Sequence, residues 1–332
     1  MPISPGQGYT EGNFAVFSEL VSTTWRNHSS KVADAVSKHN ALYRKITANG
    51  KKRKEDGGLS IVAPLEYASN STYQRYSGYD VLNINAVDVI TAAEYPWRQA
   101  AVNLAASGLE LRTNSSRNQI INLTKAKIRN AQHSFANGLS ADIYSDGTAS
   151  NQINGLQALI SDAGTGTVGG INAGTYAFWQ NIVQSAAAPL QGGGAITPSA
   201  STIESLMLPL WIKLTRGMDM PDLIMMDDSW FTFYEMSQTS LKRYAPDDTG
   251  KGGMVSLKSK GADVEFDSSG GIPAAHMYFL NTNYLEMVVH SDADITMLPQ
   301  IEAINQDAVV KTILWMGNLV CSNRMLQGVG KA

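Results

Sequence analysis

The stretch NSSRNQIINLTKAKIRNAQHSFANGLSADIY, residues 114–144, predicts one long helix. Ser116 and Gln119 have the spacing of a capping box, in which a hydroxyl and an amide satisfy free backbone N–H groups. An apolar face repeats at helical spacing through Ile121, Thr124, Ile128, Ala131, Phe135 and Leu139. Gly147 follows as a stop signal. At about 1.5 Å per residue this helix would run about 40 Å, which is long for a globular domain.

Three cations lie beside this apolar face. Lys125 and Arg129 flank it on one side, and Lys127 lies on the other. They are candidates to face an anionic cargo, and an ordinary solvated helix edge is the alternative.

Upstream of the helix, residues 49–58 read NGKKRKEDGG. Four consecutive cations, Lys51, Lys52, Arg53 and Lys54, stand between two glycine-bearing turns, which predicts an exposed tip. Strand-like segments at 59–65, 73–79 and 81–90 predict a long hairpin beside this tip.

Tyrosines give this hairpin an aromatic surface, at Tyr67, Tyr73, Tyr76 and Tyr79. An isolated hairpin cannot bury both of its faces. We therefore expect the four cations and the four tyrosines to contact another subunit. Cations interleaved with tyrosines also suit nucleic acid, but the net charge of −3 favours a solvated tip or a protein contact.

The flanking regions predict a mixture of helices and strands. Residues 1–10 read as an extended arm, and residues 12–26 as an amphipathic helix. Residues 163–203 carry no charged side chain and predict irregular structure lying against other protein.

Further along, Ser201 and Glu204 have capping-box spacing before a helix that contains Pro209, and Ser229 is expected to open another helix. We expect strands at 223–226, a hairpin formed by 277–280 and 284–290, and strands at 308–321 broken by Gly317. The class is α+β.

Composition fits a chain whose surface is partly covered by protein, and it fits an uncharged monomeric domain equally well. Charged residues make up 17%, against about 25% in an average protein. Residues 1–135 hold 16 basic and 10 acidic side chains, and residues 136–332 hold 10 and 19, so the halves carry +6 and −9. Halves of opposite sign can pair between copies of the chain, which favours oriented self-association.

No pattern in the sequence predicts an enzyme. The G-x-G-x-x-G match at 164–169 is not followed by a helical stripe or by an acid at the required distance, and we reject it as a dinucleotide site. Residues 246–253 resemble a phosphate loop weakly and read as an exposed turn. Asp292 and Asp294 could hold a divalent cation weakly, although a polar turn is the simpler interpretation.

The histidines and the cysteine also suggest structural roles. The five histidines have no metal-ligand spacing, and Cys321 in an apolar run reads as a buried thiol of a reducing compartment. No signal peptide or membrane segment is predicted, and we expect no catalytic residue, metal or cofactor.

The order of these elements resembles the major capsid proteins of tailed bacteriophages, which have the Hong Kong 97-type fold. Several stretches are similar to recurrent phrases of that family: GLQALI at 155–160, GGINAGTYAFWQN at 169–181, PDLIMMDDSW at 221–230, MYFLN at 277–281 and WMGNLVCSN at 315–323. The resemblance runs over nearly the whole chain from about residue 40.

The resemblance implies a division of the chain. Residues 1–44 would form an N-terminal arm and residues 45–85 an extended loop over a neighbouring subunit. Residues 86–150 and 296–332 would form a peripheral domain containing the long spine helix, and residues 151–295 an axial domain. Some relatives carry a cleaved scaffolding segment, whereas this chain begins almost at the arm, so a separate scaffolding protein or prior processing is implied.

The resemblance also implies a function. The chain would form pentamers and hexamers of an icosahedral head in the virion, assembled in the host cytoplasm around double-stranded DNA, with Lys125, Lys127 and Arg129 facing the DNA. Partners would be other copies, a portal, a scaffolding protein and possible decoration proteins, with no membrane. The alternatives are an encapsulin-like compartment of the same fold and, remotely, an oxidoreductase using residues 164–169.

Overall fold

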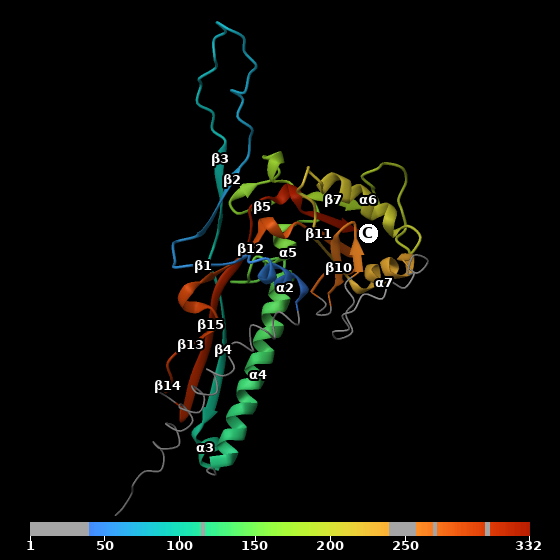
Figure 1. Ribbon diagram of the computed structural model, residues 1–332. Helices are drawn as coiled ribbons and strands as arrows, with labels where there is room; N and C mark the ends of the chain where they lie inside the picture. The colour runs from blue at the N-terminus through green and yellow to red at the C-terminus, as the bar shows by residue number, and fades with distance from the viewer. Residues whose placement is uncertain (1–39, 114–116, 239–256, 268–270, 303–305) are drawn as a thin grey trace, which may run out of the picture.

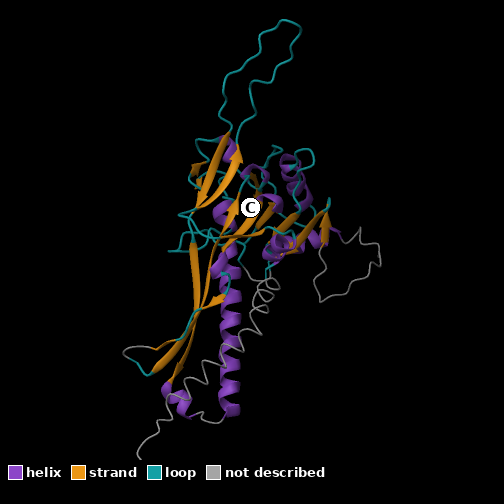
Figure 2. Ribbon diagram, turned by 60° about the vertical axis from the view of Figure 1, so that its left-hand side comes forward, coloured by secondary structure: helices purple, strands orange, loops and turns teal. Residues whose placement is uncertain are grey.

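The computed structural model describes residues 40–113, 117–238, 257–267, 271–302 and 306–332 of the chain. The molecule is elongated and has three visible parts (Figures 1 and 2). A central body holds one mixed sheet and part of another, a long arm extends from one end and contains the rest of that other sheet, and an irregular loop projects from the other end. The predicted helix 12–26 and the turn 246–253 lie outside the described residues.

The long arm is distinct from the predicted N-terminal arm of residues 1–44. It consists of the predicted long helix and a strand pair. Helix α4 spans Arg117–Tyr144, and β4 (Arg98–Ser107) pairs antiparallel along β15 (Ala308–Cys321) (Figure 1). Helix α4 packs on β4. The predicted apolar face is buried wherever its side chains are described, at Ile128, Ala131, Phe135 and Leu139.

The start of the long helix differs slightly from the prediction. A separate short helix, α3 (Gly108–Thr113), precedes α4. Ser116 of the expected capping box lies outside the described residues. The 28 residues of α4 correspond to about 42 Å, so the predicted length is confirmed.

The first sheet joins segments that are far apart in the sequence. Its order is β1-β12-β15-β13, and β4 and β14 also pair with β15. β1 (Lys52–Glu55) runs parallel to β12 (Leu285–His290), which is antiparallel to β15. The two short strands at the arm are β13 (Thr296–Met297) and β14 (Ile301–Glu302).

The second sheet has the order β7-β16-β11-β8-β10-β9. Its strands are β7 (Ile182–Ser185), β8 (Leu223–Met226), β9 (Leu257–Ser259), β10 (Ala262–Phe266), β11 (His276–Leu280) and β16 (Gly328–Lys331). Helices α6 (Ile203–Leu214) and α7 (Asp228–Ser237) pack on this sheet and on each other. Gly328 allows the close approach of α6, because a Cβ there would lie 2.7 Å from Leu214 Cδ1.

Short elements complete the chain. Two two-stranded sheets are formed by β2 (Ile61–Glu66) with β3 (Ile90–Tyr95) and by β5 (Thr167–Val168) with β6 (Ile171–Asn172). The short helices are α2 (Ala41–Ala48), α5 (Leu156–Leu159), η1 (Ala177–Trp179), η3 (Thr282–Tyr284), η4 (Ser291–Ala293) and η5 (Arg324–Leu326).

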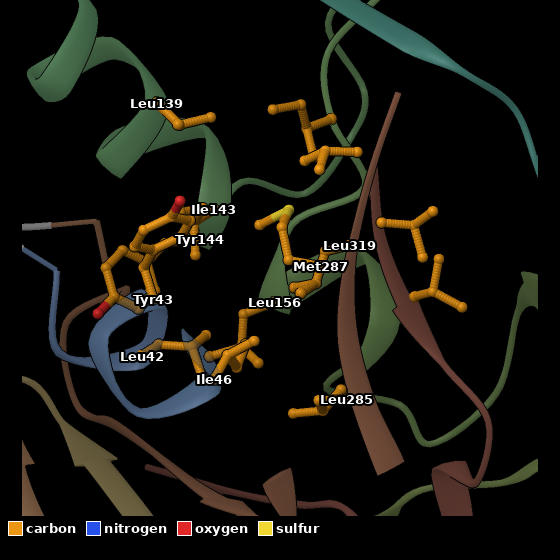
Figure 3. Packing of buried hydrophobic residues seen from close by; sticks show 14 of the residues in the cluster. Leu42, Tyr43, Ile46, Leu139, Ile143, Tyr144, Leu156, Leu285, Met287 and Leu319 are labelled. Atoms are coloured by element: carbon orange, nitrogen blue, oxygen red, sulfur yellow. The ribbon is translucent and has the colours of Figure 1, made fainter. Parts of the chain in front are cut away.

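The larger hydrophobic core lies where α2, the end of α4 and the first sheet meet (Figure 3). Its members in this region are fully or nearly fully buried: Leu42, Tyr43, Ile46, Leu139, Ile143, Tyr144, Leu156, Leu285, Met287 and Leu319. Burying one such side chain stabilises a fold by about 1.5–3 kcal/mol. This core therefore anchors the arm to the body.

Two predictions about strand pairing are wrong. Residues 277–280 and 284–290 do not form a hairpin, because β11 pairs with β8 and β16 while β12 pairs with β1 and β15. The link through η3 carries the chain from one sheet to the other. Residues 308–321 form one continuous strand through Gly317, where a side chain would lie 2.5 Å from the carbonyl oxygen of Val288.

The predicted helices at 203–214 and near 229 are present, but their caps differ from the prediction. Thr202, not Ser201, is the N-cap of α6, and its hydroxyl donates to the carbonyl of Thr197 rather than capping the helix. α6 continues through Pro209. The N-cap of α7 is Asp227, whose carboxylate accepts from the Trp230 N–H, two residues before the predicted start.

Candidate assembly surfaces

The basic block lies in a strand and not at a tip, which corrects the sequence prediction, although Arg53 and Lys54 are exposed as expected. Lys52, Arg53 and Lys54 lie in β1 and pair with β12, and Lys51 directly precedes that strand. A block of cations can form a sheet strand here because carboxylates from distant segments neutralise it.

Asp294 is the main partner of the block. Lys52 Nζ lies 2.8 Å from Asp294 Oδ1, and Lys54 Nζ lies 3.2 Å from Asp294 Oδ2. Burial alone would lower the pKa of Lys52, but the nearby Tyr43 and the hydrogen bond to Asp294 raise it overall. Arg53 pairs with Glu55 and with Glu286. Asp294, one of the two carboxylates considered as a weak cation site, therefore pairs with lysines.

The opposite charges of the two halves pair within one chain. Arg44 pairs with Glu265, and Lys45 Nζ lies 2.5 Å from Asp263 Oδ2. Together with the contacts of β1, these pairs join the basic first half to the acidic second half. These cations thus have acidic partners within their own chain, and the inference that the asymmetry serves pairing between copies stays a prediction.

The projecting loop spans residues 67–89 between β2 and β3 and contains no strand, so the predicted strands at 73–79 and 81–90 are absent (Figure 1). Tyr73, Tyr76 and Tyr79 are 83%, 66% and 105% exposed. Val81, Leu82 and Ile84 are also exposed on this loop. The sequence interpretation missed these three because their spacing suggested a strand.

Tyr67 behaves differently from the other three tyrosines. Its ring centroid lies 5.3 Å from that of Phe178, and its hydroxyl donates to the carbonyl of Asp88 at 2.9 Å. It belongs to the base of the projecting loop, where β2 and β3 meet the body. The eight predicted contact residues are therefore split among a paired strand, a loop base and an exposed loop.

The cations of α4 are also separated by the structure. Lys127 Nζ donates to the carbonyl of Ala105 and to Glu110 Oε2, which lies 2.6 Å away. The hydrogen bond from Lys127 lowers the pKa of Glu110. Arg129 is exposed, and the side chain of Lys125 lies outside the described residues. Lys127 thus has a partner in its own chain.

The uncharged segment 163–203 packs on its own chain at some positions and is exposed at others, among them Tyr176 and residues 190–195. The expectation that other subunits cover it stays a prediction. Trp179 is buried, and its indole N–H donates to the carbonyl of Val168. Residues 164–169 lead into the β5–β6 hairpin, whose turn is Gly169–Gly170, both with positive φ. No helix opens at this segment, so the geometry of a dinucleotide site is absent there.

A buried cation, Arg324, is a structural residue that the sequence interpretation missed. Its guanidinium donates to the carbonyls of Leu159 and Trp179 and to Asn181 Oδ1. No charge pattern in the sequence distinguishes it. Cys321, three residues earlier, is fully buried as predicted, and burial raises the pKa of its thiol to about 12.

Within the described parts of the chain, no group of three or more His, Cys, Asp or Glu side chains could hold a metal ion. In the same residues, no helix has the length and apolar character needed to cross a bilayer.

Solved capsid structures resemble this chain. No protein-family model matches it, and no curated protein matches it. The cyanophage A-1(L) capsid asymmetric unit gives a TM-score of 0.59 at 15% identity, over 85% of this chain and 90% of that chain. The capsid of the native GTA particle gives 0.58 at 14% identity, over 85% and 88%. A structure of Mycobacterium phage Bobi gives 0.51 at 10% identity, over 86% and 89%.

The molecule is therefore a mixed helix-and-sheet protein with the architecture of a capsid subunit. More particularly, it has the fold of tailed-phage major capsid proteins, and the predicted fold class is confirmed. The structures that this chain resembles are capsid structures, and the expectation that the chain is not an enzyme stays a prediction.

Proposed function

We propose that this chain is a major capsid protein that self-assembles into the pentamers and hexamers of an icosahedral phage head around double-stranded DNA. The observation that carries the proposal is the combination of the capsid fold with a projecting loop whose apolar side chains have no cover within the described chain. An exposed group of this kind usually marks a protein contact.

The proposed division of the chain follows the family. Residues 45–85 would be the extended loop that lies over a neighbour, and they include most of the projecting loop, whose last residues 86–89 would fall in the peripheral domain. α4 with the β4–β15 pair would form the peripheral domain. The sheet covered by α6 and α7 would belong to the axial domain of residues 151–295, except for β16, which comes from the C-terminal segment 296–332. The proposed boundary between residues 44 and 45 falls inside α2.

Assembly would rest on many weak contacts. A contact of about −4 kcal/mol corresponds to a millimolar dissociation constant. A subunit held by several neighbours gains a high effective concentration, so a closed shell persists although each contact can break. Portal, scaffolding protein and packaged DNA would be the further partners, and the exposed Arg129 is the remaining described candidate to face the DNA.

Electron microscopy of the purified chain tests the proposal. We expect closed particles, or rings of five and six, and nuclease-protected double-stranded DNA in particles from infected cells. A monodisperse monomer under all assembly conditions would contradict it. Particles that enclose protein instead of DNA would point to an encapsulin-like compartment.

The loop contact has a sharper test. Replacing Tyr73, Tyr76 and Tyr79 together with Ser should leave the subunit folded and prevent assembly. Each aromatic side chain that becomes buried contributes about 1.5–3 kcal/mol. Three of them together therefore contribute more than the about 4 kcal/mol of a single weak contact. The control replaces Asn83 and Asn85 of the same loop with Ser and should assemble normally. Unchanged particles from the tyrosine variant would refute the assignment of the loop to an interface.

A further inference from the structure

A hollow of about 420 Å³ lies where β3 passes into β4, at the end of β3 that is farther from the projecting loop. Its lining residues are Trp97, Arg98, Gln99, Ala100, Ala101, Asn151 and Leu314. The lining contains one cation and no acidic side chain. The site is thus electropositive, although the chain as a whole is acidic.

Arg98 differs from the buried or half-buried cations Lys52 and Arg324. Its Nε is buried and has no hydrogen-bond partner, and none of the described residues forms an ion pair with its guanidinium. By contrast, Lys52 has Asp294 and Arg324 has three acceptors. A buried donor without an acceptor lowers stability, and each such group in a native structure calls for a partner.

The walls of the hollow are held in place by Asn318. Its Nδ2 donates to the carbonyl of Pro96 at 2.8 Å, and its Oδ1 accepts from the N–H of Asn154 at 2.9 Å. This single buried side chain fixes the spacing between the start of β4 and the turn that carries Asn151. The hollow is therefore formed before any ligand arrives.

Asn151 itself lies in the left-handed region, with φ of 60°. Glycine adopts this conformation at lower cost than any residue with a Cβ. Asparagine keeps an amide donor in the wall, and that amide makes no hydrogen bond to another described residue. The turn thus carries strain and a free donor at the same place.

We propose that this hollow binds a small oxyanion, a carboxylate or a phosphate, through the guanidinium of Arg98 with the amide of Asn151 beside it. The planar donor fork of arginine fits both groups, and a charged hydrogen bond is stronger than a neutral one. The anion is either free in solution or is a carboxylate of a second copy. The existence of the site does not depend on shell formation.

The first experiment measures the melting temperature of the unassembled full-length chain in sodium phosphate, sodium acetate and sodium chloride at equal ionic strength. At about ten times the dissociation constant, the binding anion should raise the wild-type melting temperature by about 2 °C over chloride. Arg98→Gln should lose this rise and melt in chloride at the wild-type temperature or above. Arg98→Lys, which keeps the charge but not the fork, should show a reduced rise.

Two further variants separate binding from structure. Asn151→Gly should melt higher than wild type in chloride and respond less to the anion, which a merely structural asparagine would not do. Arg129→Gln, at an exposed arginine of α4, should respond like wild type. An equal response of wild type and Arg98→Gln, or an equal loss of stability by Arg98→Gln in every buffer, would overturn the proposal.

The second experiment repeats the titration on assembled particles and identifies the source of the anion. A rise in melting temperature that persists in particles means that a free anion fills the site. A response that disappears on assembly, with particles weakened by Arg98→Gln, means that a neighbouring carboxylate fills it. Because the first experiment uses unassembled chain, failure to form shells would refute the proposed function and leave this site testable.

Discussion

Replacing Arg324 with Met should destabilise the unassembled chain. The side chain is buried, so the substitution leaves the surface of the subunit unchanged. Arg324 is fully buried, and its donors reach three segments: the end of α5 at Leu159, the end of η1 at Trp179, and Asn181 before β7. Methionine fills much of the same volume but donates no hydrogen bond. The substitution therefore tests the contribution of the hydrogen bonds rather than of the packing.

The magnitude follows from the acceptors left behind. The carbonyls of Leu159 and Trp179 would lose the hydrogen bond that Arg324 makes to each. Asn181 Oδ1 would keep the N–H of Ser161 at 3.2 Å. A buried acceptor without a partner costs about 1–3 kcal/mol, so two cost about 2–6 kcal/mol. Removing a desolvated cation offsets part of this cost, and we expect a net loss of about 2–4 kcal/mol.

Urea denaturation followed by circular dichroism measures this loss, on chain kept below its assembly concentration because association would add to the apparent stability. Arg324→Lys should fall between wild type and Arg324→Met, because one ammonium group cannot reach all three acceptors. Arg129→Met, at an exposed position, should change the free energy of unfolding by less than about 0.5 kcal/mol. A loss below about 1 kcal/mol for Arg324→Met would show that the segments are held by other contacts.

Three further predictions concern stability. Asp294→Asn removes the carboxylate shared by two lysines of β1 and should cost about 1–3 kcal/mol in urea denaturation; no loss would mean that the strand pairing alone holds β1. Gly169→Ala should lower the melting temperature more than Gly170→Ala does. Both glycines have positive φ, but only a Cβ at residue 169 would lie 2.7 Å from a neighbouring side chain. Equal melting temperatures of the two variants would contradict this reasoning. The pKa of Glu110 is lowered in the folded chain, so its contribution is present above pH 4.5 and is lost as the pH falls through the lowered value. Glu110→Gln should therefore be less stable than wild type at neutral pH by a few tenths of a kcal/mol, and the two should converge in acid.

Local periodicity in the sequence was sufficient for several elements of the fold. The apolar face of 114–144 determined the long helix, because a 3.6-residue repeat is a property of the local chain. The short continuous apolar run at 223–226 was enough to predict a buried strand, which is confirmed at both ends. The apolar surroundings of Cys321 in the sequence were enough to predict a buried thiol.

Contacts between distant segments were decided only by the tertiary structure. The cations at 51–54 read as an exposed tip because the sequence does not show Asp294 beside them, 240 or more positions away. Strands 277–280 and 285–290 look like a hairpin, yet they pair in different sheets, since strand partners are chosen by the packing of the whole core. The sequence interpretation singled out neither Arg324 nor Arg98. Only the fold gives Arg324 three acceptors and leaves Arg98 beside an acid-free hollow, because the partner of a buried charge is set by three-dimensional neighbours.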